Sequence, residues 1–205
     1  MPSQTIPLFP LGTVLFPDGY LPLQIFEVRY LDMVRKALAG DSLFGVVTLL
    51  DGGEVRTPQS NEILAATGSL AHIRSSVAPM PALMQIQCIG TSRFRILSSE
   101  RQRNGLWMGE VELLVPDQAV PIPEELNDTV AALGRLIRTL QEEQVVEAEM
   151  PLQPPFRLDD AGWVANRWAE LLPLAPADKL RLLELDNPLL RLELIQDALH
   201  EHGVL

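Results

Sequence analysis

The sequence contains only one cysteine, Cys88, among its 205 residues. An intramolecular disulfide is therefore impossible, which favours a reducing compartment, and we expect a cytoplasmic protein. Long apolar runs are also missing, because the run at residues 43–50 is far shorter than the ~20 residues that a membrane-spanning helix needs. The N-terminus lacks the basic start and apolar stretch of a secretory signal. We therefore expect neither export nor a membrane partner.

Positive charge is scarce as well. The chain has 16 Lys and Arg against 27 Asp and Glu, a formal net charge of −11, and such a surface repels phosphate backbones. DNA is accordingly not an expected partner. Residues 1–118 hold 9 basic and 11 acidic residues, whereas residues 119–205 hold 7 and 16. The two parts should differ in surface chemistry, although acidic residues on helices commonly serve only to solvate an outer face.

The familiar motifs of catalysis and cofactor binding are absent from the sequence. No glycine is followed by lysine and no two glycines are spaced as Gly-x-Gly, which excludes the usual ATP and dinucleotide loops. No Gly-x-Ser-x-Gly elbow occurs, and the only lysines for a Ser-Lys dyad, Lys36 and Lys179, fall in patterns typical of helix surfaces. His72 has no obvious nucleophile to accompany it, which leaves a hydrolase as the weakest hypothesis. We predict no catalytic residue, no cofactor and no enzymatic activity.

A metal site at the C-terminal end is also not expected. His200 and His202 flank Glu201, and Asp197 could add a ligand. On a helix, however, residues two apart diverge, and histidines at a helix end also suit its dipole. We predict no metal.

Short apolar runs in the first 118 residues predict strands. Residues 6–10, 14–16 and 20–26 are cut by proline and glycine, which suits a small barrel-like sheet with prolines at strand edges or ends. Residues 43–50 form a continuous apolar run of β-favouring types and predict a buried strand.

Two further patterns support a sheet. Residues 84–88 alternate between apolar and polar types, so Met84, Ile86 and Cys88 should point to the core. Cys88 is then a packing residue. The Asn-Gly dipeptide at residues 104–105 tolerates the positive φ of a tight turn and predicts a hairpin.

Apolar stripes with a helical period predict five helices. One lies among the strands, between Glu27 and Ala39, with Gly40 as its stop. After Pro116 four helices follow in succession, opened by Pro123, by Asp159 or Asp160, by Pro176 and by Pro188. In chain order the predicted core stripes are Leu31, Val34 and Leu38; Leu126, Val130, Leu133, Ile137 and Leu140; Val164, Trp168 and Leu171; Leu180 and Leu183; and Leu192, Ile195 and Leu199.

Strands followed by helices, with little alternation between them, indicate an α+β fold. The economical division is a β-rich subdomain at residues 1–118 and an α-helical subdomain at residues 119–205.

Several segments in order resemble the N-terminal, substrate-binding domain of Lon proteases. The opening, IPLFPLGTVLFP at residues 6–17 and LPLQIF at residues 21–26, is similar to that family's opening, with Asp18 inserted ahead of Gly19. The later segments that agree are FGVV at 44–47, TGSLAHI at 67–73, GTSRFRIL at 90–97, GEVEL at 109–113, LPL at 172–174, KLRLLE at 179–184 and Arg191-Leu192.

The resemblance implies a β-rich PUA-like pseudo-barrel followed by a helical bundle. It also implies a protein-recognition or adaptor module without the ATPase and Ser-Lys peptidase domains of full Lon proteases. The expected partners are unfolded or specific client proteins, and the sequence leaves open a separate ATPase or protease and a homodimer. Because PUA-like sheets include RNA binders, an RNA-binding module is the alternative. The residues available for it are Arg93, Arg95, Arg101 and Arg103, with Phe94 and Trp107 as the nearby aromatics.

The segment at residues 75–82 is the candidate protein-binding surface. It is small, apolar and constrained by proline, which favours a loop, and Met80 offers an adaptable contact. We predict that Val77, Met80 and Pro81 contact the client. The competing interpretation is that Met80 only caps the sheet as part of this loop.

Overall fold

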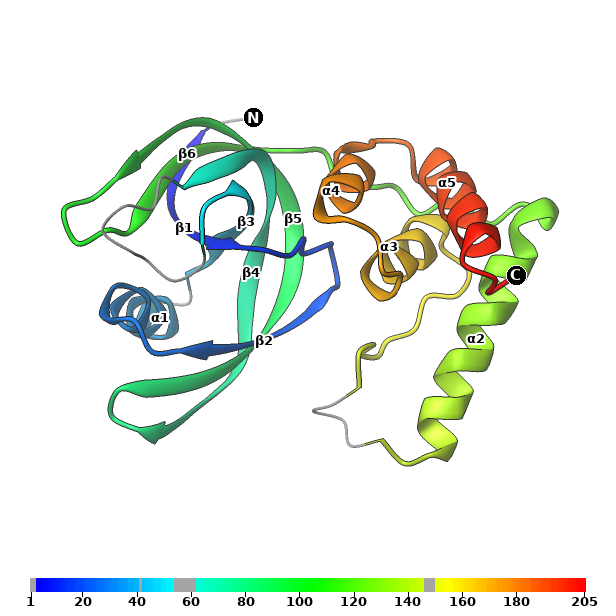
Figure 1. Ribbon diagram of the computed structural model, residues 1–205, viewed down its shortest axis with the longest axis horizontal. Coiled ribbons are helices and arrows are strands. Elements are labelled where there is room, and N and C mark those ends of the chain that lie inside the picture. The colour runs from blue at the N-terminus through cyan, green and yellow to red at the C-terminus, as the bar shows by residue number, and fades with distance from the viewer. Residues whose placement is uncertain (1–2, 41, 54–61, 146–149) are drawn as a thin grey trace. The chain divides into compact units, whose positions relative to one another are not determined.

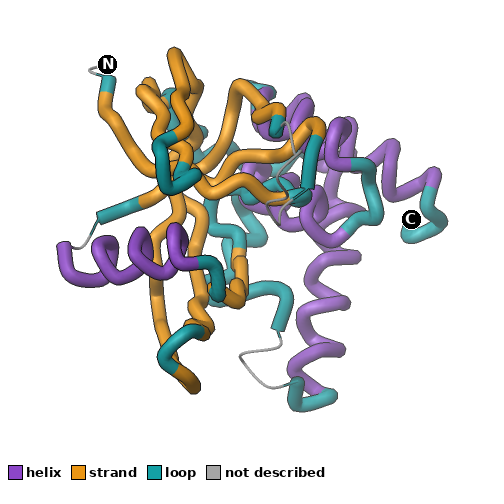
Figure 2. The backbone as a smooth tube through the Cα atoms, turned by 60° about the vertical axis from the view of Figure 1, so that its left-hand side comes forward, coloured by secondary structure: helices purple, strands orange, loops and turns teal. Residues whose placement is uncertain are grey.

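The computed structural model describes residues 3–40, 42–53, 62–145 and 150–205. The chain divides into two compact units, Met1–Val115 and Pro116–Leu205, which we call the β unit and the helical unit. The described strands all belong to the first unit, and every described helix except α1 (Val28–Gly40) belongs to the second (Figures 1 and 2). The predicted α+β class is confirmed.

The β unit is built on one sheet. Its strands are β1 (Gln4–Leu11), β2 (Tyr20–Ile25), β3 (Phe44–Asp51), β4 (Ile63–Met80), β5 (Leu83–Arg101) and β6 (Trp107–Leu113). They are ordered β2-β5-β4-β3-β1-β6, and only the β1–β3 pair is parallel. A further pairing of β5 with β6 closes the sheet on itself, so that β2 is left as its edge strand.

Glycines make room for large side chains inside the closed part of the sheet. Phe94 and Leu8 are fully buried there. A Cβ atom at Gly68 would lie 2.3 Å from the carbonyl oxygen of Val46 and 2.7 Å from the Phe94 ring, and one at Gly45 would lie 2.7 Å from the same ring. Both contacts are far closer than packed atoms tolerate. The interior of the sheet therefore depends on residues without side chains at these positions.

A second apolar core lies between α1 and strands of the sheet. Figure 2 shows α1 running beside these strands. The rings of Phe9 and Tyr30 are 4.1 Å apart at their centroids. Met84, Ile86 and Cys88 are all buried in this core, which confirms the inward face predicted from their alternation.

Two predictions of detail are wrong. Residues 14–16 are not a strand but a buried connection, in which the carbonyl oxygen of Leu15 accepts a hydrogen bond from Ser69 Oγ at 2.6 Å. A connection packed inside the unit has the same apolar composition as a strand. Leu38 is exposed because the buried stripe of α1 passes through Met33 and Ala37 instead.

The hairpin predicted around residues 104–105 is confirmed, because β5 pairs with β6 as far as Arg101 and Trp107. Its turn is longer than a two-residue loop. The N–H of Gln102 donates to the carbonyl oxygen of Leu106 at 2.8 Å, and Gly105 takes a φ of 88°. Glycine is favoured at such a φ because it has no Cβ atom to clash.

The helical unit begins with a short 3₁₀ turn, η1 (Glu124–Leu126). It continues with α2 (Asn127–Glu142), α3 (Ala161–Leu171), α4 (Pro176–Glu184) and α5 (Pro188–Glu201). Pro176 and Pro188 are the first residues of their helices, as predicted. Asp160, not Asp159, caps α3, because its Oδ1 accepts from the N–H of Gly162 at 3.0 Å. The predicted core residues are buried except Val130, Leu140 and Leu171, which are half-buried.

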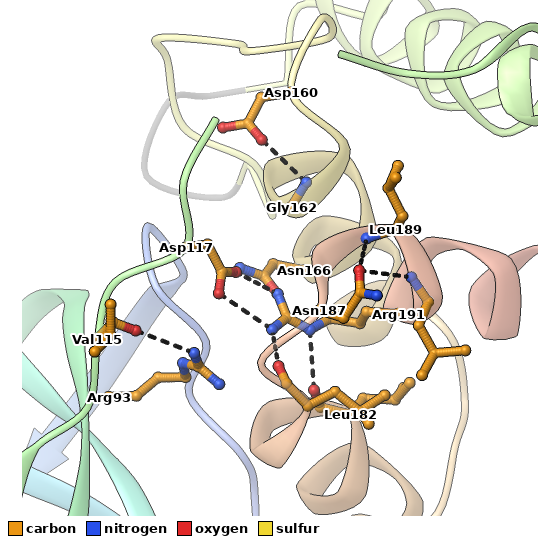
Figure 3. Close-up of polar contacts among 12 residues, drawn as sticks. Arg93, Val115, Asp117, Asp160, Gly162, Asn166, Leu182, Asn187, Leu189 and Arg191 are labelled. Carbon is orange, nitrogen blue, oxygen red and sulfur yellow. Dashed lines mark hydrogen bonds and ion pairs between the residues drawn. The ribbon is translucent and has the colours of Figure 1, made fainter. Parts of the chain in front are cut away.

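A buried arginine ties the helical unit together (Figure 3). Arg191 of α5 donates from Nη1 to Asp117 Oδ2 at 2.5 Å and to Asn166 Oδ1 at 3.0 Å. Its Nε donates to the carbonyl oxygen of Leu182 at 3.0 Å, and its Nη2 donates to that of Leu185. Segments that are far apart in the sequence thus converge on one guanidinium group.

Candidate functional site

The segment at residues 75–82 is not a loop but the end of a two-stranded arm made by β4 and β5. The pairing continues through Val77 with Gln85 and Met80 with Leu83, and Figure 1 shows the arm running out to its turn. Beyond Ala71, no described strand except β5 pairs with β4, which explains why Pro79 is tolerated in a strand. Small residues and prolines resemble a loop in sequence, and only the partner strand reveals the arm.

The three predicted contact residues all lie on this arm. The side chains of Val77 and Met80 are 62% and 58% exposed, and Pro81 is exposed at the turn. Met80 therefore does not cap the sheet. The carbonyl oxygen of Pro81 accepts a hydrogen bond from Arg35 Nη2 at 3.3 Å, which connects the tip of the arm to α1.

Strands β2, β5 and β4 together present an outer face whose paired residues are uncharged, with the exposed Arg74 beside them at the bulge of β4 between Ile73 and Ser75. The residues on it alternate with the buried ones, and the registers place them in three rows across the sheet. The rows are Tyr20, Ile89 and His72; Pro22, Gln87 and Ser75; and Gln24, Gln85 and Val77. Ser75 Oγ donates to Gln87 Oε1 at 2.8 Å within one row. None of these residues is Asp, Glu, Lys or Arg, and we call this surface the outer face.

A groove of about 220 Å³ runs along the edge of β2. It is lined by residues 9–11 of β1, by residues 22–27 and by Tyr30 of α1. The four consecutive β2 residues from Pro22 to Ile25 line the groove, although their side chains alternate between the two faces of the sheet. The groove therefore follows the edge of the strand. The pairing of β1 with β6 stops at Leu8 and Trp107, which leaves residues 9–11 on the opposite wall. No pattern in the sequence indicates this groove, because its two walls meet only in the folded sheet.

The groove has one acidic side chain among apolar and uncharged polar ones. Glu27 is the charged residue among those that line it. Its Oε2 accepts from Arg29 Nε at 3.0 Å, and the buried Arg29 guanidinium lies 4.4 Å from the centre of the Tyr30 ring. Burial raises the pKa of Tyr30 well above its usual value, so its hydroxyl stays neutral. Phe26, at the rim, is 55% exposed.

Only part of the predicted arginine cluster is exposed, because Arg95 and Arg103 lie on the surface but Arg93 and Arg101 are engaged in contacts within the β unit. Arg93 is buried and donates to the carbonyl oxygen of Val115 at 3.3 Å. Arg101 and the indole N–H of Trp107 both donate to the buried carboxylate of Glu62. Phe94 is fully inside the sheet, so it cannot stack on a base.

The remaining candidate groups serve packing or lie on the surface. Cys88 is buried, and this burial raises the pKa of its thiol to about 12. His72 and Lys36 are exposed. Lys179 is only half-exposed, contrary to the surface position predicted for it: its Nζ donates to the carbonyl oxygen of Glu170 at 2.9 Å, and burial lowers its pKa.

A family model described as the ATP-dependent protease La (LON) substrate-binding domain matches residues 5–201. The chain belongs to this family. The match covers both units, which confirms the resemblance of the opening and later segments to Lon N-terminal domains. The family is described by substrate binding.

Solved structures of Lon N-terminal domains cover nearly the whole chain. The Lon N-terminal domain protein from Xanthomonas campestris is 34% identical, with a TM-score of 0.75 over 95% of this chain and 98% of its own. The N-terminal domain of Mycobacterium avium complex Lon protease is 18% identical, with a TM-score of 0.63 over 97% of this chain and 100% of its own. This second likeness supports the fold alone.

Curated relatives are longer and match only in part. Protein cereblon from Danio rerio is 27% identical over 124 residues, and protein cereblon from Gallus gallus is 27% identical over 119 residues. Each match covers 58% of this chain but only 27% and 25% of the relative, so the chain spans about a quarter of their length. Separately, no helix in the described ranges is long and apolar enough to cross a membrane.

Proposed function

We propose that this Lon-type domain is a non-catalytic recognition or adaptor module that binds non-native or specific client proteins through its arm and outer face. The observation that carries the proposal is the exposure of Val77 and Met80 beside three rows of uncharged residues on the sheet. Depletion of charge marks the core of protein interfaces. In a chain of which 21% of residues are charged, three rows of uncharged residues are a good candidate for such a core, with Arg74 as a charge at its border.

The chemistry of the arm suits varied clients. Methionine is flexible and polarisable, so Met80 adapts to different apolar side chains. The amides of Gln24, Gln85 and Gln87 can both donate and accept, so they pair with whatever polar groups a client presents. Such a surface favours many weak, related partners over one exact fit.

The finer features of the assembly belong to the same proposal. The closed sheet of the β unit supports a PUA-like pseudo-barrel, and the packing of α3 on α5 supports a helical bundle. The two compact units support a division into subdomains near residue 118. The family description supports the binding of substrates of an ATP-dependent protease, and the proposal adds that the clients are delivered to a separate protease in the cytoplasm.

The test uses α-lactalbumin that is reduced and carboxymethylated, which keeps it unfolded, and its native form as the comparison. The immobilised full chain should bind the unfolded form and not the native one. The double substitution Val77→Ser/Met80→Ser should weaken binding at least tenfold, whereas Leu190→Ser/Leu194→Ser, which changes exposed leucines of α5, should leave it unchanged. Equal binding of both forms, or equal loss in both variants, would exclude the arm as the recognition surface.

A further inference from the structure

The groove beside β2 lies where the sheet is open between two strand edges. We propose that it binds an extended polypeptide segment that pairs with the edge of β2. This segment places one large apolar side chain over Phe9 and Tyr30 and carries a lysine or arginine beside Glu27. The inference rests on the proposed function and names the class of segment that this second site would recognise.

The outward backbone groups of β2 follow from its pairing with β5. Because Gly90 N–H donates to the carbonyl oxygen of Gly19 at 2.9 Å, odd-numbered residues of β2 direct their backbone groups toward β5. Pro22 and Gln24, the even-numbered residues of β2 that line the groove, then direct theirs toward it. Pro22, which has no N–H, occupies one of these outward positions, as expected for an edge strand. Gln24 shares this orientation and keeps its N–H and carbonyl for an added strand.

Extended chain is the conformation that can use this edge. A helical segment satisfies its backbone groups internally and has none to offer a strand. A segment without structure of its own gains backbone hydrogen bonds by adding a strand to an exposed sheet edge. Among the described residues no strand takes up this edge of β2.

The size of the groove favours a single side chain. Pockets for drug-sized ligands and cofactors run to about 300–1,000 Å³, and this groove is smaller, at about 220 Å³. Phe9 and Tyr30 lie together on it, with exposed Phe26 at its rim. Aromatic walls of this kind suit an inserted aromatic or large aliphatic residue.

The charge of the groove distinguishes between apolar segments that could bind there. Glu27 is the charged residue that lines the groove, and its partner Arg29 is buried, so a carboxylate and not a guanidinium faces the ligand. The chain as a whole carries a net charge of −11. A segment with a basic residue next to its apolar anchor is complementary to both, whereas an acidic segment is repelled.

The probe is a fluorescein-labelled ten-residue peptide of threonine and lysine with one central phenylalanine, titrated with the full chain. Replacing the phenylalanine by alanine should weaken binding at least tenfold, and replacing the lysines by glutamates should do the same. N-methylation of alternate residues removes the N–H groups of one strand edge. One of the two alternating sets should abolish binding, and the other should not, because only one edge of the peptide faces β2.

Two variants of the protein isolate the β2 edge. Gln24→Pro removes an outward N–H at a position equivalent to Pro22 and should weaken peptide binding at least tenfold, with an unchanged circular dichroism spectrum. Gln24→Ala keeps the N–H and should weaken it less than threefold. If both N-methylated peptides bind equally, or if the two variants behave alike, the inference is overturned. Retained binding of unfolded α-lactalbumin in that case would leave the proposed function standing, and its loss would count against both.

Discussion

Removing the carboxylate of Asp117 should destabilise the helical unit strongly. The Arg191 side chain is 1% exposed and the Asp117 side chain 17% exposed, so their ion pair is largely screened from water. Breaking a buried pair from one side costs about 3–5 kcal/mol because the other charge stays buried and uncompensated. Arg191 would keep Asn166 and two backbone carbonyls as acceptors, so we expect the lower end, about 3 kcal/mol, for Asp117→Ala.

A surface pair of the same chemistry provides the control. Asp178 accepts from Arg181 at 3.0 Å, with both side chains largely exposed, and exposed pairs contribute about 0–1 kcal/mol. Asp178→Ala should therefore change the unfolding free energy by less than about 1 kcal/mol. The double substitution Asp117→Ala/Arg191→Met should recover part of the loss, because no unpaired charge is left inside.

Urea unfolding followed by tryptophan fluorescence measures these differences, since two of the three tryptophans, Trp163 and Trp168, lie in α3. The reasoning is refuted if Asp117→Ala and Asp178→Ala destabilise equally. It is also refuted if the double variant is less stable than Asp117→Ala, since the loss would then not come from an uncompensated charge.

Three further outcomes are expected. Gly68→Ala should lower the unfolding free energy by about 3 kcal/mol, because its Cβ meets a backbone carbonyl. Gly40→Ala at the end of α1, where a Cβ would lie 3.9 Å from Ser42 Oγ, should be neutral within about 1 kcal/mol in urea titrations. Burial raises the pKa of the Cys88 thiol to about 12 in the folded protein, whereas the thiol of the unfolded chain has a pKa of 9.0. The buried neutral thiol therefore contributes fully to the stability of the folded protein below pH 9, and this contribution is lost as the pH rises toward 12. Between pH 9 and 10.5 the wild type should lose about 2 kcal/mol more than Cys88→Ala, and parallel pH profiles would contradict this. Asp160→Ala should lower the free energy of unfolding by about 1 kcal/mol, because α3 loses its N-terminal cap, whereas Asp159→Ala should leave it unchanged.

Local patterns predicted most of the elements. Alternation placed Met84, Ile86 and Cys88 on the inner face, and prolines at the first helical position marked the starts of α4 and α5. These signals are local because they depend on the period of one strand or on the missing N–H of one residue.

Features that depend on partners far along the chain were not predictable in the same way. The arm looked like a loop because proline and small residues pair only when β5 lies alongside. The groove needs Phe9 and Leu23 to meet across two strand edges. The arginine cluster near the β5–β6 hairpin looked exposed in sequence, but Glu62 accepts from Arg101, and Arg93 is buried.

The most direct test of client recognition is residue-resolved NMR of the ¹⁵N-labelled full chain during titration with carboxymethylated, unfolded α-lactalbumin. Amide shifts should concentrate in residues 72–89 and 20–26, which carry the arm, the outer face and the groove edge. Native α-lactalbumin should produce none of them. Shifts confined to the helical unit or to the surroundings of Arg95 and Arg103, or no shifts at saturating concentration, would contradict the account.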